Sequence, residues 1–242
     1  MKRVSLKSKI ITGIITLSIL CINTSRAQEK ISASFGGDFV SSYVWRGIKQ
    51  AGASIQPSLN IGYKNFSLGS WASTDIASAG AKEVDFTASY ENSGIKVAVT
   101  DYWWDGEGAF RYLSYPDDSY NGHYLETAIS YTLGNSFPLS ISWNTFVLGK
   151  GNKKTDGKNS YSTYIELGYP FTIGGLDMGI STGFTPWTST VYNTDGFKFT
   201  SIQINSSKNI RVSDSISFPI WGSIIANPAH EDIHFVLGVS IK

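Results

Sequence analysis

The stretch Ser54-Ile55-Gln56-Pro57-Ser58-Leu59-Asn60-Ile61-Gly62-Tyr63 alternates apolar and polar residues with a period of two. In an extended chain the apolar members lie on one face and the polar members on the other. A helix would scatter both sets around its circumference, so the pattern predicts a β-strand. The same alternation recurs toward the end of the chain, where the apolar set is Ile233, Phe235, Leu237, Val239 and Ile241.

Segments with this pattern follow one another along most of the chain, and none shows a helical period. The twelve predicted strands are 31–45, 53–63, 66–74, 82–91, 95–103, 123–133, 139–147, 160–169, 176–185, 197–206, 213–225 and 232–242. In the third and the tenth, Trp71 and Ile202 fall out of phase with their neighbours. A β-bulge or a misplaced boundary would explain either irregularity.

The first 27 residues predict an export signal rather than a strand. Lys2, Arg3, Lys7 and Lys9 precede the apolar run 10–22, and Ser25-Arg26-Ala27 offers small residues at a cleavage site. The pattern predicts a signal peptide over residues 1–27 that is cleaved after Ala27. Cys21 would leave with it, so the mature chain would have no cysteine. A sizeable exported protein without disulfides fits the bacterial envelope.

Composition and charge narrow the class of protein further. Only 16% of residues are charged, 14% are aromatic and the net charge is +1. Five of the 20 basic residues lie in the predicted signal peptide, which leaves 15 basic against 19 acidic residues. This balance gives no basic surface for nucleic acid. The chain has no run of 18 or more apolar residues, so it predicts no transmembrane helix.

Alternation alone would also fit a soluble β-sandwich. A membrane barrel is favoured by a weakly charged polar face, by aromatic residues near strand ends and by connections that alternate between short and long. The aromatic examples include Tyr43, Trp45, Trp103 and Trp104; Lys64-Asn65 is a short connection, and 104–122 is the longest. Strands in lipid must pair every backbone polar group, so the sheet must close. We expect residues 28–242 to form an all-β, transmembrane, antiparallel up-and-down β-barrel of about 12 strands (10–14).

Residues 37–48, GDFVSSYVWRGI, resemble the opening motif of the TorF-type family of outer-membrane porins. The residues that carry the motif are Tyr43, Trp45, Arg46 and Gly47. The resemblance spans most of the mature chain and is concentrated in its first third. It implies a bacterial outer-membrane barrel of the porin type, and it supplies no substrate.

The inward face of such a barrel would carry the functional groups. The pore-lining candidates are Asp38, Arg46, Glu83, Asp85, Lys96, Glu126, Glu166 and Asp177. Acids outnumber bases in this set, which would favour cations in a water-filled pore. The alternative is that these charges pair across the lumen and block it, because 12 strands lie between filled 8-stranded and open 16-stranded barrels. Arg46 is expected to form a structural ion pair with Asp38 in the lumen; the alternative is that Arg46 is a selectivity residue.

The long connection after Trp103 has two interpretations. With Trp104, Asp105, Glu107 and Arg111 it could fold inward as a constriction, or it could remain an outer loop. No enzyme motif or metal-ligand spacing is present in the sequence, and His230 and His234 are too far apart in a strand to share one ion. We predict no enzymatic activity and no cofactor.

The sequence therefore predicts a passive pore for small solutes or ions. Its partners would be outer-membrane lipid and the barrel-assembly machinery. The alternative is a closed or plugged barrel whose outer loops bind a ligand or another protein, and a third reading is a soluble secreted β-protein.

Overall fold

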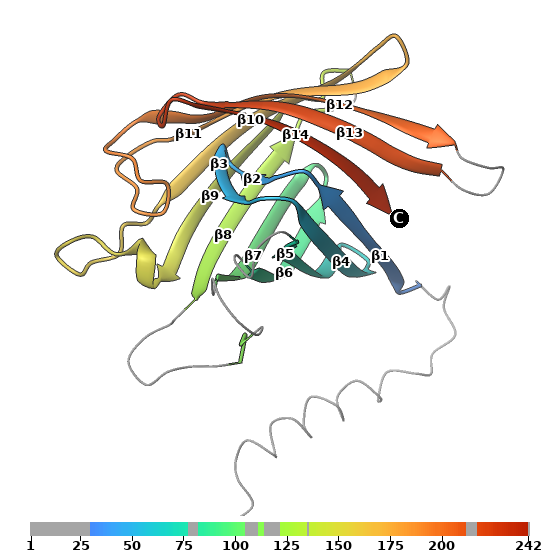
Figure 1. Cartoon of the computed structure of the whole chain (residues 1–242). Helices are drawn as coiled ribbons and strands as arrows, with labels where there is room; N and C mark the ends of the chain where they lie inside the picture. Colours follow the sequence, from blue (N-terminus) through green and yellow to red (C-terminus); the bar gives the residue numbers. More distant parts are fainter. Residues whose placement is uncertain are drawn as a thin grey trace, which may run out of the picture. The chain divides into compact units, whose positions relative to one another are not determined.

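The computed structural model describes residues 30–76, 82–104, 111–113, 122–134, 136–211 and 217–241. The predicted signal peptide lies outside these residues. Twelve antiparallel strands close into a barrel in the order β1-β14-β13-β12-β11-β10-β9-β8-β7-β6-β5-β4 (Figure 1). They are β1 (Ser32–Val40), β4 (Ser54–Tyr63), β5 (Phe66–Asp75), β6 (Lys82–Asn92), β7 (Ile95–Trp104), β8 (His123–Thr132), β9 (Ser140–Gly149), β10 (Thr163–Ile173), β11 (Leu176–Thr185), β12 (Lys198–Arg211), β13 (Ser217–Asn227) and β14 (Asp232–Ile241). The predicted fold and the number of barrel strands are confirmed.

Short turns and longer loops lie at opposite ends of the barrel. The turns include residues 64–65, 93–94 and 174–175, and the loops include 41–53, 150–162 and 186–197. We call these ends the turn end and the loop end. Lys150–Asn152 forms a short 3-10 helix in one loop. Among the described residues, no helix is long and apolar enough to cross a membrane.

The outer wall of the barrel is apolar along its whole circumference. Its exposed apolar side chains include Phe35, with an exposed fraction of 72%, and Ile204, with 40%. Other members are Leu59, Leu68, Phe86, Val99, Ile129, Ile141, Ile180, Ile224, Phe235 and Leu237. Neighbouring positions on the same strands point into the lumen and are mostly polar, including the buried Gln56, Ser73, Asn144 and Ser223. An apolar belt of this extent would be unstable in water, whereas it suits contact with lipid.

The predicted first strand, 31–45, is wrong in its second half. The wall strand β1 ends at Val40, and the chain then forms a separate hairpin of β2 (Tyr43–Trp45) and β3 (Ile48–Ala51). This hairpin, blue in Figure 1, lies within the barrel. Tyr43 and Trp45 therefore do not belong to an interfacial girdle, because they are lumen residues.

The two predicted strands with an out-of-phase residue have different explanations in the structure. On β12, Gly183 pairs with Ser201 while Phe184 pairs with Phe199, so Thr200 is the extra residue of a β-bulge. The bulge explains why Ile202 is out of phase with Phe199. On β5 the register is continuous, and Trp71 points into the lumen, where its ring lies 5.3 Å from that of Tyr43.

Two predicted strands end too early. Strand β10 continues beyond its predicted end at 169 through Pro170 to Ile173, and β12 continues beyond its predicted end at 206 to Arg211. The sheet closes where β1 meets β14, with a described register from Gly37–Ile241 to Val40–Gly238. Strand β1 pairs much further with β4, from Ser32–Gly62 to Val40–Ser54. The closing seam is therefore the shorter of the two ladders of β1.

Candidate functional site in the barrel lumen

A two-residue turn, Arg46-Gly47, joins β2 to β3. Both residues have positive φ, 49° at Arg46 and 84° at Gly47. Turns of this kind match the twist of a tight hairpin. Glycine adopts positive φ freely, but a non-glycine residue there costs on the order of 1 kcal/mol. The Trp-Arg-Gly motif noted in the sequence is thus the tip of the inward hairpin.

The tip of the hairpin docks against the wall far from its own origin. A Cβ atom on Gly47 would overlap the carbonyl oxygen of Thr200, on the bulge of β12. From β13, the Asn227 side-chain amide donates a hydrogen bond to the Gly47 carbonyl at 3.1 Å. The hairpin starts between β1 and β4, so it reaches from that side of the lumen to β12 and β13. It therefore fills much of the loop end.

Arg46 is held by a carboxylate and by aromatic faces. Its two terminal nitrogens donate to the two carboxylate oxygens of Glu126 on β8, at 2.6 and 2.9 Å. Its guanidinium carbon lies 4.4 Å from the centre of the Trp45 ring and 4.8 Å from that of Tyr164. The Tyr192 hydroxyl accepts a further hydrogen bond from Arg46. Bidentate pairing and stacking are the two contacts for which a guanidinium is better suited than an ammonium group.

Aromatic rings surround this ion pair. Trp45 stacks on Tyr192 at 5.7 Å and meets Tyr102 and Trp104 edge-on at 5.8 and 5.7 Å. Tyr192 comes from the loop 186–197 and is fully buried, so a second loop also enters the lumen. The Tyr102 hydroxyl donates to Glu126 at 3.0 Å. The loop end is therefore packed like a protein core.

The electrostatic surroundings keep the central groups in fixed charge states. Burial lowers the pKa of Arg46, but the neighbouring Tyr192 and Glu126 more than offset this, and the pKa lies well above its usual value. Burial raises the pKa of Tyr192 above its ordinary range, with Arg46 opposing the shift. For Tyr43, burial raises the pKa, and the carboxylates of Glu83 and Asp85 add to the increase. Arg46 is consequently a permanent cation, and both tyrosines are neutral.

Seven of the eight predicted pore-lining residues lie on the inward face of the barrel wall, at different depths, and Arg46 lies in the lumen at the tip of the hairpin. Near the loop end, Glu83, Asp85 and Glu126 are buried, with exposed fractions of 4%, 9% and 3%. Asp38 and Glu166 are half-buried, whereas Lys96 and Asp177, near the turn end, are exposed. The inward charged groups are therefore exposed at the turn end and buried near the loop end.

The expected ion pair between Arg46 and Asp38 is wrong. Arg46 pairs with Glu126, and Asp38 instead accepts a hydrogen bond from the hydroxyl of Ser240 on β14 at 2.5 Å. The two residues are close in sequence, but the turn at Arg46 carries its side chain across the lumen. Tyr164 donates to Glu166 at 2.7 Å, so this carboxylate is also engaged.

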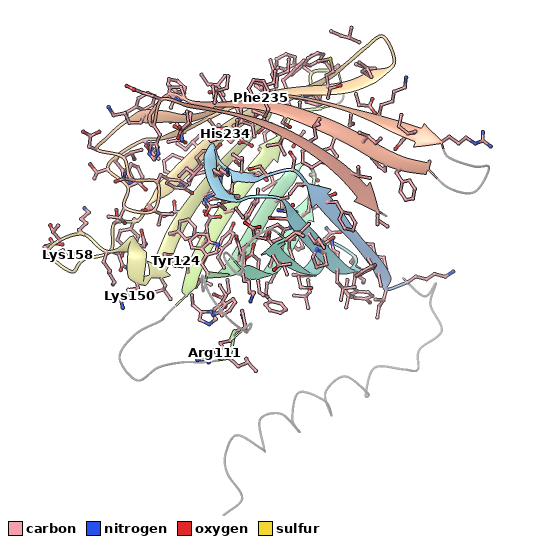
Figure 2. All side chains as sticks on the ribbon, viewed as in Figure 1. Arg111, Tyr124, Lys150, Lys158, His234 and Phe235 are labelled. Carbon is pink, nitrogen blue, oxygen red and sulfur yellow. The ribbon has the colours of Figure 1, made fainter. Side chains whose placement is uncertain are left out.

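Among the described residues of the predicted long connection after Trp103, Trp104 packs in the lumen and residues 111–113 do not. Arg111 is exposed and lies outside the barrel (Figure 2). Next to it, Tyr112 packs on the outward-facing Phe86, with ring centres 5.1 Å apart. Asp105 and Glu107 lie outside the described residues. The loops seen to enter the lumen are 41–53 and 186–197.

A polar clasp holds Tyr112 to the outer wall. His123 Nδ1 lies 3.0 and 3.1 Å from the carboxylate oxygens of Asp101, and Nε2 lies 3.0 Å from the Tyr112 carbonyl oxygen. The Tyr112 hydroxyl donates to Asp101 at 2.6 Å. Within the described chain, no group of three His, Cys, Asp or Glu side chains could hold a metal ion.

Sequence reasoning missed Tyr164, Tyr192, Thr200 and Asn227. Each contacts the hairpin tip from a distant part of the chain, and no local pattern marks that contact. The signal available in the sequence was the dipeptide Arg46-Gly47, because Gly after a polar residue predicts a tight turn.

No family model matches the chain, and no curated protein sequence matches it. The chain is structurally similar to the KdgM porin, with a TM-score of 0.46 and 9% identity over 88% of this chain and 99% of that one. A complex of KdgM porin with disordered oligogalacturonate gives a TM-score of 0.45 with the same identity and coverage. An engineered mutant of the Rh. blastica porin gives 0.38 with 10% identity, over 87% of this chain and 73% of that one. TM-scores below 0.5 at 9–10% identity carry no assignment of function, so the function is inferred from the residues in the lumen of this chain.

Proposed function

We propose that this protein is an outer-membrane porin that lets small solutes or ions pass passively. The observation that carries the proposal is a closed barrel with an apolar outer wall and a polar, charged lumen. Such a barrel crosses lipid without an unpaired sheet edge, and the polar inner face is the only surface along which a solute could travel.

The charge of the lumen supports a preference for cations. The inward face carries the carboxyl groups of Asp38, Glu83, Asp85, Glu166 and Asp177. The cationic Arg46 is paired with Glu126. A row of carboxylates with few opposing cations attracts positive ions into a pore. We therefore assign Asp38, which is half-buried, and Asp177, which is exposed, as selectivity residues.

Planar-bilayer recordings of the purified, folded protein test this function. We expect discrete conductance steps and, in a salt gradient, a reversal potential of the sign for cations. Asp177→Asn should reduce this selectivity, while Asp195→Asn, on an exposed loop residue, should not. Absence of conductance from a sample that migrates as a folded barrel on unboiled gels would refute the pore.

A second candidate function is favoured by the inward hairpin. Because β2, β3 and Tyr192 fill the loop end, the barrel could be closed and its loops could bind a ligand or another envelope protein. Deletion of residues 43–51 separates the two. A closed barrel predicts conductance only in the deletion variant, whereas a constitutive pore predicts conductance in both proteins.

A further inference from the structure

The cage around Arg46 has the chemistry of a binding site for organic cations. It offers one carboxylate in bidentate geometry, at 2.6 and 2.9 Å, and the faces of Tyr164 and Tyr192, at 4.8 and 5.9 Å from the guanidinium carbon. Carboxylates and aromatic faces together recognise guanidinium and alkylammonium ions. We propose that Glu126, Tyr164 and Tyr192 form a site for guanidinium-type cations, which the protein's own Arg46 occupies in this structure.

The cage and its occupant belong to different structural units. Glu126 and Tyr164 stand on the wall strands β8 and β10, and Tyr102, which donates to Glu126, stands on β7. Arg46 and Trp45 stand on the hairpin, which forms a two-stranded sheet of its own and shares no ladder with the wall. The Glu126 carboxylate and the Tyr164 ring are therefore positioned by ladders that do not include the hairpin.

The hairpin depends on its tip for its position. An isolated two-stranded hairpin is marginally stable, and Arg46 holds a positive φ that is unfavourable for a side chain with a Cβ. The contacts that offset these costs include the ion pair of Arg46 with Glu126, the hydrogen bond between Gly47 and Asn227, and the packing of Trp45 on Tyr192. A free cation that bound Glu126 would remove the first of them.

A free guanidinium ion would compete with Arg46 for the Glu126 carboxylate. A free guanidinium ion and Arg46 need the same carboxylate oxygens, so the ion binds only to the state with the hairpin withdrawn. Its apparent affinity in the wild-type protein is reduced by the small fraction of molecules in that state. This inference deepens the proposed pore function by naming a class of solute.

The test uses the folded full-length protein in detergent micelles and methylguanidinium chloride at millimolar, non-denaturing concentrations. Binding is measured by calorimetry against sodium chloride of equal ionic strength. Arg46→Ala should bind methylguanidinium at a concentration about tenfold or more below that needed by the wild type. The double variant Arg46→Ala/Glu126→Gln should lose this binding. Lys49→Ala removes a cation from an exposed position of the same hairpin, and it should behave as the wild type does.

Unboiled gel mobility identifies variants that form the barrel. If Arg46→Ala does not fold, it is replaced by Arg46→Gln, which also removes the guanidinium group from Glu126 but keeps more of the side-chain packing. Folded variants that bind methylguanidinium no better than sodium, or that bind it equally well without Glu126, would overturn the cage. Binding without any conductance in bilayers would support the cage and refute the pore, so the two proposals fail separately.

Discussion

Arg46 Nη1 lies 2.6 Å from Glu126 Oε1, although the two residues are 80 positions apart in the sequence. The pair ties the tip of an inward hairpin to strand β8. With side chains 12% and 3% exposed, it is one of the most buried charge pairs that the described chain contains. The state of the loop end therefore depends on this contact.

Glu126→Gln should destabilise the docked hairpin strongly. The substitution keeps the shape of the side chain but leaves the Arg46 guanidinium buried without a counter-ion, which costs about 3–5 kcal/mol. Urea unfolding of the barrel in micelles measures the loss in free energy. The double variant Arg46→Ala/Glu126→Gln should lose less than the two single variants added together, because the pair acts as a unit. Strict additivity would contradict the buried pair.

Gly47→Ala should displace the hairpin tip. The added methyl group would overlap the Thr200 carbonyl oxygen, and the backbone has a φ of 84°. We expect a water-soluble maleimide to label an Ile48→Cys background faster, because Ile48 packs against the aromatic cluster. Gly157→Ala is the matched control, since Gly157 has a φ of 81° and no atom within 4 Å of the added Cβ. Equal labelling rates in the two variants would argue against docking of the tip.

The barrel could be predicted from the sequence because its signal is local. Alternation along 54–63 is set by the period of a strand and needs no knowledge of the partner strand. The same locality explains the error at 31–45. Tyr43 and Trp45 continue the alternation of Phe39, and only Ser41-Ser42 interrupts an otherwise strand-like run. An inward hairpin and a longer wall strand look alike at this scale.

The lumen site could be predicted only in part. Glu126 was placed on the inward face by its alternation, but its partner was not identified. Gly47 and Asn227 are 180 residues apart, and their contact exists only after the barrel closes. Side-chain contacts across a lumen follow from strand number and register, which no short segment encodes.

Val99→Arg should impair the barrel in lipid far more than Ala98→Arg. Val99 is 44% exposed on the outer face near the middle of β7, whereas Ala98 points into the lumen. An arginine on the lipid face costs about 2–4 kcal/mol near the bilayer midplane. Urea unfolding in phospholipid vesicles measures the difference. A smaller effect for Val99→Arg than for Ala98→Arg would contradict a lipid-facing outer wall.

His123→Phe should release the segment at Arg111. The variant keeps the ring contact with Tyr112 but loses both imidazole hydrogen bonds, to Asp101 and to the Tyr112 carbonyl. Trypsin should then cleave after the exposed Arg111 several-fold faster, because local opening becomes easier. His230→Phe, which alters a bond to the Tyr192 carbonyl instead, should leave this cleavage rate unchanged. An unaltered cleavage rate in both variants would show that the hydrogen bonds of His123 do not hold this segment on the wall.

The short ladder between β1 and β14 gives the hairpin a mechanical consequence. The hairpin leaves the wall beside β1 and is bonded to β13 through Gly47 and Asn227, so it bridges the join from within. Ser41, at its base, exchanges hydrogen bonds with Leu237 of β14 at 2.8 and 2.9 Å. Separation of the first and last strands must therefore also detach the hairpin, so the element that fills the loop end also resists opening of the barrel.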